Sequence, residues 1–245
     1  MPHSRKLVAL VTGSSSGIGA AIARRLSAEE MTVVVNAARS ADAGRRLAES
    51  LPDARFVQAD ISDAGQVRQL LDEVAEEFGV LDLLVNNAGV TRAIPHTDLD
   101  AATAEVWQDI LGVNVVGTWQ TSAAAMPLLR ASGAGHIVNI SSVAGVRPAG
   151  SSIPYAVSKA AVNHMTRLLA GAVGPGVRVN AIAPGLVDTP WTETFTEIRE
   201  RVRQAVPLRR TGTPEDIAEL VVGLHRSAYT TGEVVLADGG AHLLI

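Results

Sequence analysis

The chain has 245 residues, of which 47% are hydrophobic and 19% are charged, and its formal net charge is -4. This composition is typical of a globular protein with a buried core. The small negative charge provides no basic surface of the kind that binds nucleic acid or an anionic membrane, so we expect neither as a partner.

Cysteine is absent from the sequence, which excludes disulfides and thiolate metal sites and is compatible with a reducing compartment. The six histidines are scattered without a metal-ligand spacing, and we expect no bound metal. The polar N-terminal segment 1–6 leads directly into an apolar run, so no signal peptide is predicted. No apolar run approaches the roughly 20 residues that span a bilayer. We therefore expect a cytoplasmic protein.

The first predicted elements are a strand, a glycine-rich turn and a helix. The apolar run 7–11 is followed by a turn that contains Gly13, Gly17 and Gly19, and then by a helical pattern with Ile22 on its apolar face. Glycine permits a tight turn and a close approach of the backbone, and the N-terminus of a helix attracts a pyrophosphate. The segment therefore predicts the phosphate-binding corner of a dinucleotide fold, although its glycine spacing departs from the G-x-G-x-x-G pattern.

The rest of the chain alternates short apolar runs with helical patterns, which favours βαβ units and a parallel sheet. The predicted strands that follow are 32–35, 55–59, 81–85, 136–140, 177–182 and 234–236, and the predicted helices are 42–51, about 66–78, about 105–130 and about 155–172. We expect a single α/β domain over residues 1–245 with a doubly wound parallel sheet. Ligands bind beyond the carboxyl ends of such strands, so residues from Gly13 to Pro184 are expected to converge on one cleft.

Tyr155 and Lys159 lie four residues apart, which places both side chains on one face if the segment is helical. A nearby ammonium group favours the ionised phenol and lowers its pKa from about 10. Such a phenol can give a proton to a carbonyl oxygen or take one from an alcohol. The alternative interpretation is one buried contact and one solvated tip.

The two motifs together resemble the short-chain dehydrogenase/reductase family over nearly the whole chain, and within it the 3-oxoacyl-carrier-protein reductase branch. The matching positions occur in the family's order, and they are Thr12–Gly19, Asn86–Gly89, Asn114, Ser142, Tyr155, Lys159, Pro184–Gly185 and Asp238–Gly240. The resemblance implies a Rossmann-type fold.

The resemblance also implies a catalytic tetrad. Tyr155 would be the general acid/base, and Lys159 would lower its pKa and bind the nicotinamide ribose. Ser142 would donate a hydrogen bond to the substrate oxygen, because the family places its catalytic serine thirteen residues before the tyrosine, which excludes Ser141. Asn114 would hold a water that links Lys159 to solvent; the alternative is a polar residue that interrupts a helix.

The cofactor residues are likewise implied by the resemblance. They are Gly13, Ser15, Ser16, Gly17, Ile18, Gly19, Arg39, Asp60, Ile61, Asn87, Ala88, Gly89, Tyr155, Lys159, Pro184, Gly185, Val187 and Thr189. Asp60 would contact the adenine amino group, or would only cap the segment that follows its strand.

The end of the second predicted strand indicates the cofactor. Enzymes of this family that use NAD usually place an acidic residue there, where this chain has Ala37, Ala38 and Arg39. The planar fork of an arginine suits a 2′-phosphate, so NADP(H) is favoured over NAD. Many relatives that use NADP carry a second basic residue just before Gly17, whereas this chain has Ser16 there. The alternative interpretation of Arg39 is an ordinary solvated residue.

The expected function is an NADP(H)-dependent oxidoreductase that transfers a hydride between nicotinamide and a ketone or secondary alcohol. Reduction of a 3-oxoacyl group on a carrier protein is the narrower alternative, and it is disfavoured because the stretch 170–176 has no lysine or arginine. A non-catalytic nucleotide sensor on the same fold is disfavoured because the tetrad is complete.

Residues from about 186 to 205 are expected to form a substrate lid that is mobile without ligand. Trp191 and Phe195 either line an apolar pocket or anchor the lid on the body, and the sequence leaves both open. The charged stretch 199–203 is interpreted as a solvated helix face. The expected partners are a small carbonyl or alcohol substrate and further copies of the chain. A homo-tetramer, or failing that a dimer, would assemble through helices 105–130 and 155–172.

Overall fold

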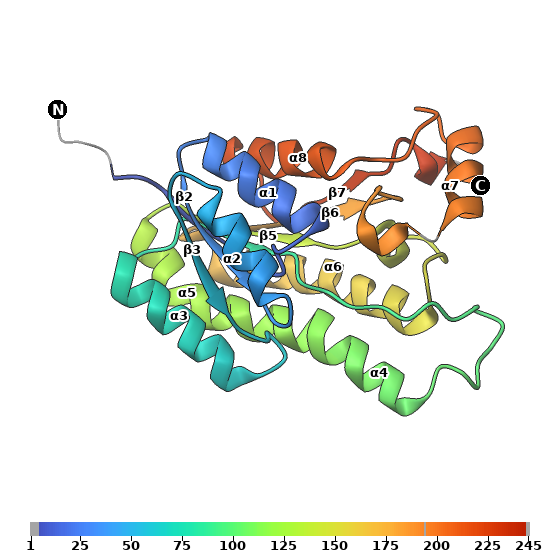
Figure 1. The fold of residues 1–245 in the computed structure, drawn as a ribbon, viewed down its shortest axis with the longest axis horizontal. Coiled ribbons are helices and arrows are strands. Elements are labelled where there is room, and N and C mark those ends of the chain that lie inside the picture. The colour runs from blue at the N-terminus through green and yellow to red at the C-terminus, as the bar shows by residue number, and fades with distance from the viewer. Residues whose placement is uncertain (1–4, 194, 244–245) are drawn as a thin grey trace.

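The structure is a computed structural model that describes residues 5–193 and 195–243. These residues contain a parallel sheet with the strand order β3-β2-β1-β4-β5-β6-β7 (Figure 1). The strands are β1 Val8–Val11, β2 Thr32–Ala37, β3 Ala54–Gln58, β4 Leu83–Asn86, β5 Gly135–Ile140, β6 Val177–Pro184 and β7 Val234–Ala237. The predicted doubly wound parallel sheet is confirmed.

Helices cover both faces of this sheet. The α-helices are α1 Gly17–Ala28, α2 Ala41–Glu49, α3 Ala64–Phe78, α4 Ala104–Leu111, α5 Thr118–Ser132, α6 Ile153–Val173, α7 Thr196–Ala205 and α8 Pro214–Arg226. Shorter helical turns are η1 Gly112–Gly117, η2 Val143–Gly145, η3 Pro190–Thr192 and η4 Ala241–Leu243. Figure 1 shows α1 and α8 on one side of the sheet and α3, α5 and α6 on the other.

The buried core forms two layers because successive strand residues point to opposite faces. Val11 of β1 packs in the layer that also holds Ile22 of α1, whereas its neighbour Leu10 packs in the layer with Leu70 of α3 and Leu129 of α5. All four residues of β1 are buried. Apolar runs without alternation are what a sheet covered on both faces requires.

The direction of strand addition reverses between β1 and β4. The chain first builds outward from β1 to β3, and then continues from β4 to β7 on the other side of β1. At such a reversal the connections leave the sheet in opposite directions, so a crevice forms beyond the carboxyl ends of the two strands. The glycine-rich turn after β1 and the segment after β4 meet at this point.

The predicted helix 105–130 differs from the observed structure. The backbone runs as α4, then as the π-helical turn η1, and then as α5. The wider turn contains Asn114, whose side chain bonds outside the helix, and it is bounded by Gly112 and Gly117. A Cβ atom on Gly117 would lie 2.9 Å from Ile61, so the missing side chain lets this helix lie close to the loop after β3. π-helical turns of this kind are frequent at functional sites.

The predicted lid range 186–205 contains η3 and α7, and Thr194 within it lies outside the described residues. None of the described residues of α7 is buried, and Glu200, Arg201 and Arg203 are exposed as predicted, whereas Arg199 is half-buried and pairs with Asp188. Figure 1 shows α7 beyond the end of the sheet, apart from the helices that cover its two faces. Among the described residues, no helix is both long and apolar enough to cross a membrane.

Candidate active site

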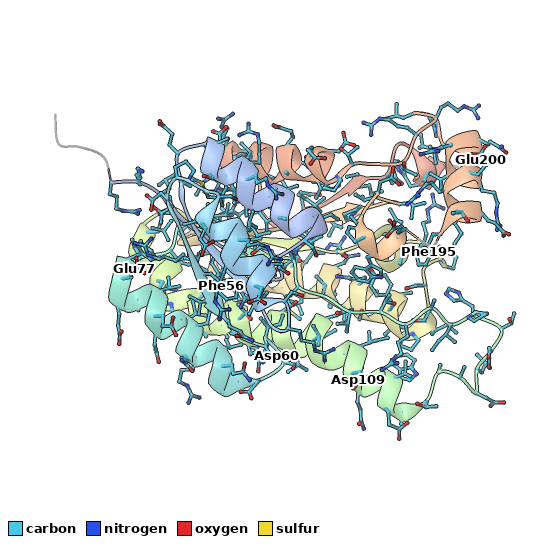
Figure 2. The ribbon with its side chains drawn as sticks, in the orientation of Figure 1. Phe56, Asp60, Glu77, Asp109, Phe195 and Glu200 are labelled. Carbon is cyan, nitrogen blue, oxygen red and sulfur yellow. The ribbon has the colours of Figure 1, made fainter. Side chains whose placement is uncertain are left out.

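A cleft of about 1620 Å³ runs along the carboxyl ends of the strands. Its walls reach from the glycine-rich turn to the C-terminal turn η4, and Figure 2 shows two of the lining residues, Asp60 and Phe195, well apart from each other. The predicted site residues all line this cleft, except Ser15 and Asn114. The convergence that the sequence pattern predicted is therefore present.

The glycine-rich turn lies directly against the segment after β4. Gly13 has a φ of 61°, in the left-handed region that favours glycine, and a Cβ atom there would lie 2.7 Å from the Cα atom of Ala88. A Cβ atom on Gly19 would lie 2.5 Å from the side-chain nitrogen of Asn87. Because neither contact leaves room for a methyl group, both positions require glycine.

Polar side chains hold this turn in place. The amide nitrogen of Asn87 donates to the backbone oxygens of Thr12 and Gly13 at 2.9 and 3.0 Å, and the Thr12 hydroxyl accepts from the backbone N–H groups of Asn87 and Ala88 at 3.0 and 3.1 Å. Asn36, buried at the end of β2, accepts from the Gly13 N–H at 3.3 Å. The sequence analysis missed Asn36, although a polar residue inside an apolar strand was a usable signal.

The start of α1 leaves polar groups available beside the turn. Ser16 precedes α1, and its side chain makes no capping hydrogen bond. The Thr189 side chain lies about 3.5 Å from where a Cβ atom of Gly17 would be, so the segment after β6 passes close over the turn. Ser15 does not contribute to the cleft wall.

Arg39 and Asp60 mark the end of the cleft formed by β2 and β3. Arg39 is exposed and has no hydrogen bond or ion pair to any other described residue. Its neighbour Ala38 lines the cleft, whereas Ala37 is buried and does not line the cleft. The Asp60 carboxylate accepts from the backbone N–H and the hydroxyl of Ser62 at 2.9 and 2.7 Å. The capping alternative for Asp60 is thus realised, and Asp60 also lines the cleft together with buried Ile61.

Tyr155 lies in the first turn of α6, where Ser152 caps the helix by accepting from the Tyr155 N–H at 3.3 Å. Ser142 follows β5 and accepts from the Ala144 N–H at 3.1 Å. Burial raises the pKa of Tyr155 above its usual value, and a hydrogen bond with the Ser142 side chain opposes this in part. Both residues line the cleft, where the phenol is held in its neutral form.

Lys159 lies one turn further along α6 and is 5% exposed. Its ammonium donates to the backbone oxygen of Ile140 at 2.9 Å and lies 5.7 Å from the centre of the Tyr155 ring. Burial lowers the pKa of Lys159 to about 8. The expectation that Lys159 lowers the pKa of Tyr155 is wrong for this structure. The ammonium lies over the phenol ring, and burial of the phenol raises its pKa.

Asn114 is buried behind the cleft wall and does not line it. Its side-chain oxygen accepts from the Val90 N–H at 2.8 Å, and its nitrogen donates to the Val90 oxygen and the Ser158 hydroxyl at 3.0 and 2.9 Å. A Cβ atom on Gly89 would lie 3.3 Å from the Asn114 oxygen and 3.5 Å from the Lys159 nitrogen. Asn114 thus ties the segment after β4 to α6 immediately beside Lys159.

Ser141 serves a different purpose from Ser142. It is buried, and its hydroxyl donates to the backbone oxygen of Lys159 at 3.2 Å. This bond fastens the end of β5 to α6. Ser142 is the serine whose hydrogen bond partly offsets the burial that raises the pKa of Tyr155, and both residues line the cleft.

The lid segment contributes aromatic side chains to the cleft. Trp191 and Phe195 both line it, and the Trp191 ring makes an edge-to-face contact with Tyr155, with ring centres 6.1 Å apart and planes inclined by 74°. Trp191 is 47% exposed. Of the two alternatives left open by the sequence, the pocket-lining one matches these positions.

Asp238–Gly240, named from the sequence only as a matching position of the family, forms the C-terminal wall of the cleft. A Cβ atom on Gly185 would lie 2.9 Å from the Cα atom of Asp238, so the segment Pro184–Gly185 packs against Asp238–Gly240. Arg210, His96 and His242 also line the cleft, and no local sequence signal marks them. Among the described residues, no group of three or more histidine, aspartate or glutamate side chains could hold a metal ion.

Comparison with known proteins gives the family. A family model described as enoyl-(acyl carrier protein) reductase matches residues 13–242. The chain is 63% identical over 240 residues to a protein named ketoacyl reductase 2 of the granaticin polyketide synthase from Streptomyces violaceoruber, with 97% of this chain and 96% of that protein covered. It is 35% identical over 240 residues to the 3-oxoacyl-[acyl-carrier-protein] reductase of Thermotoga maritima, with 95% and 96% covered.

A solved structure described as a short-chain dehydrogenase/reductase from Burkholderia xenovorans has a TM-score of 0.92 and 36% sequence identity, and the match covers 98% of this chain and 100% of that one. Sequence, fold and the arrangement of the cleft therefore agree. The chain belongs to the short-chain dehydrogenase/reductase family, in its 3-oxoacyl-carrier-protein reductase-like branch of oxidoreductases that act on carbonyl and alcohol groups.

Proposed function

We propose that the protein is an NADPH-dependent ketone reductase in which Tyr155 is the general acid/base. The observation that carries this proposal is the arrangement of Tyr155, Ser142 and Lys159 in the wall of the same cleft that the glycine-rich turn borders. A proton donor, a second hydroxyl donor and a buried cation are what an oxygen that changes from carbonyl to alcohol requires.

The chain's own residues fit a dinucleotide. Gly13 and Gly19 let the glycine-rich turn pack tightly, because a methyl group at either position would clash with neighbouring protein atoms. The Ser16 hydroxyl at the start of α1 makes no capping hydrogen bond. Backbone N–H groups at a helix start favour a pyrophosphate, and exposed Arg39 would bind the 2′-phosphate. The residues that would hold the cofactor are Gly13, Ser16–Gly19, Arg39, Asp60, Ile61, Asn87–Gly89, Tyr155, Lys159, Pro184, Gly185, Val187 and Thr189. When bound, NADPH supplies the hydride.

Tyr155 would donate the proton. Burial raises the pKa of its phenol, so the group is protonated at neutral pH and can protonate the substrate oxygen as negative charge develops there. The Ser142 oxygen accepts a hydrogen bond from the Ala144 N–H, so its own hydroxyl proton is not used in that bond. Ser142 would donate that proton in a hydrogen bond to the same substrate oxygen.

Lys159 would stabilise the phenolate that remains after proton transfer. Its ammonium is buried 5.7 Å from the ring centre, where attraction to a negative charge is weakly screened. Asn114 positions the segment containing Gly89 beside this ammonium. The water that the family resemblance assigns to Asn114 would complete the return of a proton to Tyr155.

We propose a ketoacyl compound as the substrate, because two similar proteins are named ketoacyl or 3-oxoacyl reductases. A carrier-bound form of that substrate is the second candidate. Exposed Arg147 favours it, since Arg147 is followed directly by Pro148 in the wall of the cleft and offers a cation to an acidic carrier.

The direct experiment measures NADPH oxidation with a 3-ketoacyl thioester, simple ketones and the matching 2-enoyl thioester. Reduction of the ketoacyl compound without reduction of the enoyl compound is expected, because the Ser142 and Tyr155 hydroxyls are placed for an oxygen. Reduction of only the enoyl thioester would contradict the proposal. Attaching the same ketoacyl group to an acyl carrier protein then tests the second candidate through a lower KM.

We also propose a homo-tetramer, with a dimer as the next alternative. Val116 and Trp119 near the start of α5 and Val157 and Leu168 on α6 are between 44% and 62% exposed. Large apolar side chains gathered on two neighbouring helices are typical of subunit interfaces. Light scattering should give a tetramer mass that falls when Leu168→Asp is introduced, and a wild-type monomer would rule the proposal out.

Finally, we propose that residues 1–245 form one domain in which 186–205 is the substrate lid. Trp191 and Phe195 of this segment line the cleft, and Asp188 at its base forms an ion pair with Arg199 of α7 at 2.9 Å. Hydrogen exchange across 186–205 should slow when NADP⁺ is added. Identical exchange with and without NADP⁺ would show a preformed wall instead.

A further inference from the structure

The cleft is larger than a single small ligand needs. Its volume of about 1620 Å³ exceeds the roughly 300–1,000 Å³ of common small-molecule pockets, so a cofactor and a sizeable substrate can occupy it together. Apolar side chains from three separate segments line the cleft. Val143 follows Ser142, Ile94 is bonded through its N–H to the backbone oxygen of Ser151 at 2.8 Å, and Phe195 comes from the lid.

Trp191 is the aromatic wall residue that contacts Tyr155. Its ring centre is 6.1 Å from that of Tyr155, and the 74° inclination means that the contact uses one face or edge of the indole. Trp191 is 47% exposed and lines the cleft, so part of the indole surface is open to a ligand. A carbonyl oxygen within about 3 Å of the Tyr155 hydroxyl places the groups on that carbonyl carbon in the part of the cleft that this indole lines.

An ordered turn presents the indole. The Thr189 N–H donates to the Thr192 hydroxyl at 3.1 Å, and that hydroxyl donates to the Val187 oxygen at 2.7 Å. Pro190 restricts the backbone immediately before Trp191, and Arg199 donates to the Thr192 oxygen at 3.1 Å. Thr189 and Thr192 are therefore hydrogen-bonding partners that order this turn.

We propose that Trp191 is a specificity-determining residue that selects ketones whose carbonyl belongs to a flat, ring-bearing skeleton over open-chain aliphatic ketones. The inference rests on the proposed ketone reduction and names the class of ketone. A planar ring stacks on the indole or meets its edge, whereas a flexible chain gains only apolar burial. The additional aromatic interaction corresponds to about threefold to tenfold in affinity.

The test compares ketones with the same number of carbons: 2-tetralone, whose carbonyl is in a fused ring, and 2-decanone, an open aliphatic chain. In Trp191→Leu, which keeps apolar bulk but removes the ring, the ratio of kcat/KM for 2-tetralone to that for 2-decanone should fall threefold to tenfold through KM. Trp191→Phe should retain most of the ratio. Tyr229→Leu is the matched control, because Tyr229 is a fully exposed aromatic residue that does not line the cleft.

A measurement without turnover separates this inference from the proposed function. The dissociation constant of 2-naphthol, a planar ring that is not reduced, is measured by calorimetry in the presence of NADP⁺. It should rise threefold to tenfold in Trp191→Leu and remain unchanged in Tyr229→Leu. If no ketone is reduced but 2-naphthol binding depends on Trp191, ketone reduction fails as a function and the aromatic subsite remains.

Equal losses for 2-tetralone and 2-decanone in Trp191→Leu would overturn the inference and make Trp191 an anchor of the lid. An unchanged KM for both ketones would overturn it as well. The circular dichroism spectrum of Trp191→Leu must match that of wild type. The mass of its assembly in solution must match as well, because loss of a partner subunit that contacts Trp191 would lower that mass. If Trp191→Leu does not fold, Trp191→Met replaces it in the same comparison.

Discussion

The Nζ atom of Lys159 lies 5.7 Å from the centre of the Tyr155 ring and donates its hydrogen bond to the backbone oxygen of Ile140. The cation therefore reaches the phenol across the ring face and through a buried medium. Such an arrangement favours a phenolate once it forms, while burial keeps the phenol protonated beforehand. The pair is thus suited to a tyrosine that begins the reduction as an acid.

The pH dependence of ketone reduction should follow the protonation of the Lys159 side chain. Burial lowers the pKa of Lys159 from about 10.5 to about 8, so its charge is present below that pH and is lost as the pH rises through it. We expect kcat for ketone reduction to fall above about pH 8. Lys159→Arg, which keeps its charge at high pH, should move this fall upward if it folds. A flat profile from pH 7 to pH 10 in wild type would contradict the assigned role.

Cofactor preference should depend on Arg39. Wild type should show a higher kcat/KM with NADPH than with NADH, because Arg39 is exposed at the cleft without a competing partner among the described residues. Arg39→Ala should narrow the difference. An acid intended to favour NADH belongs at Ala38, which lines the cleft, and not at buried Ala37. A wild type that prefers NADH would refute the assignment.

Two glycine substitutions test the cofactor turn. Gly19→Ala would place a methyl group 2.5 Å from the Asn87 side chain and 2.6 Å from the Gly13 oxygen, so it should cost about 1–3 kcal/mol in unfolding free energy and weaken NADPH binding. Gly223→Ala in α8 is the control, because a Cβ atom there meets nothing within 4 Å. That variant should gain about 0.5–1 kcal/mol of stability. Equal denaturation midpoints for the two variants would count against the crowded turn.

Much of the fold could be predicted because its signals are local. A strand that is covered on both faces is apolar throughout, so short apolar runs mark the strands of such a sheet. The predicted strands 7–11 and 136–140 have nearly the observed bounds. The interruption of the helix 105–130 could not be predicted. It depends on the close approach of Gly117 to Ile61 and on the bonds from Asn114 to Val90, which join segments distant in the sequence.

The candidate site divides in the same way. The spacing of Tyr155 and Lys159 is local, so their common face followed from the sequence. The direction of the Tyr155 pKa did not, because burial depends on walls contributed by other segments of the chain. The contacts of Asn36 with Gly13 and of Asp238 with Gly185 were not predicted either, since the partners are distant in the chain.

Acid should destabilise the fold through His136. This residue is buried in β5, with Asn180 at 3.0 Å and the ring of His225 stacked 5.8 Å away. Burial first, and then the positive charge of Arg178, hold the pKa of His136 well below its usual range. The unfolded chain therefore binds the proton more tightly, so stability is complete above about pH 6.5 and falls as the pH drops below it.

Melting temperatures from pH 8 to pH 5 check this expectation. In His136→Phe, which keeps an aromatic ring against His225 but has no proton to bind, the loss of stability below about pH 6.5 should be smaller than in wild type. His225 also has a lowered pKa, chiefly from burial, so part of the loss should remain. Parallel curves for wild type and variant would assign acid sensitivity to other groups.

Turnover of the Tyr155→Phe variant tests the central claim most directly. The change removes the transferable proton and keeps the ring that meets Trp191 and Lys159. NADPH oxidation with a ketone that wild type reduces should slow by at least about 10²–10⁴-fold, while the dissociation constant for NADPH stays close to that of wild type. Near-normal turnover in Tyr155→Phe, with the cofactor bound, would contradict the assignment of Tyr155 as the proton donor.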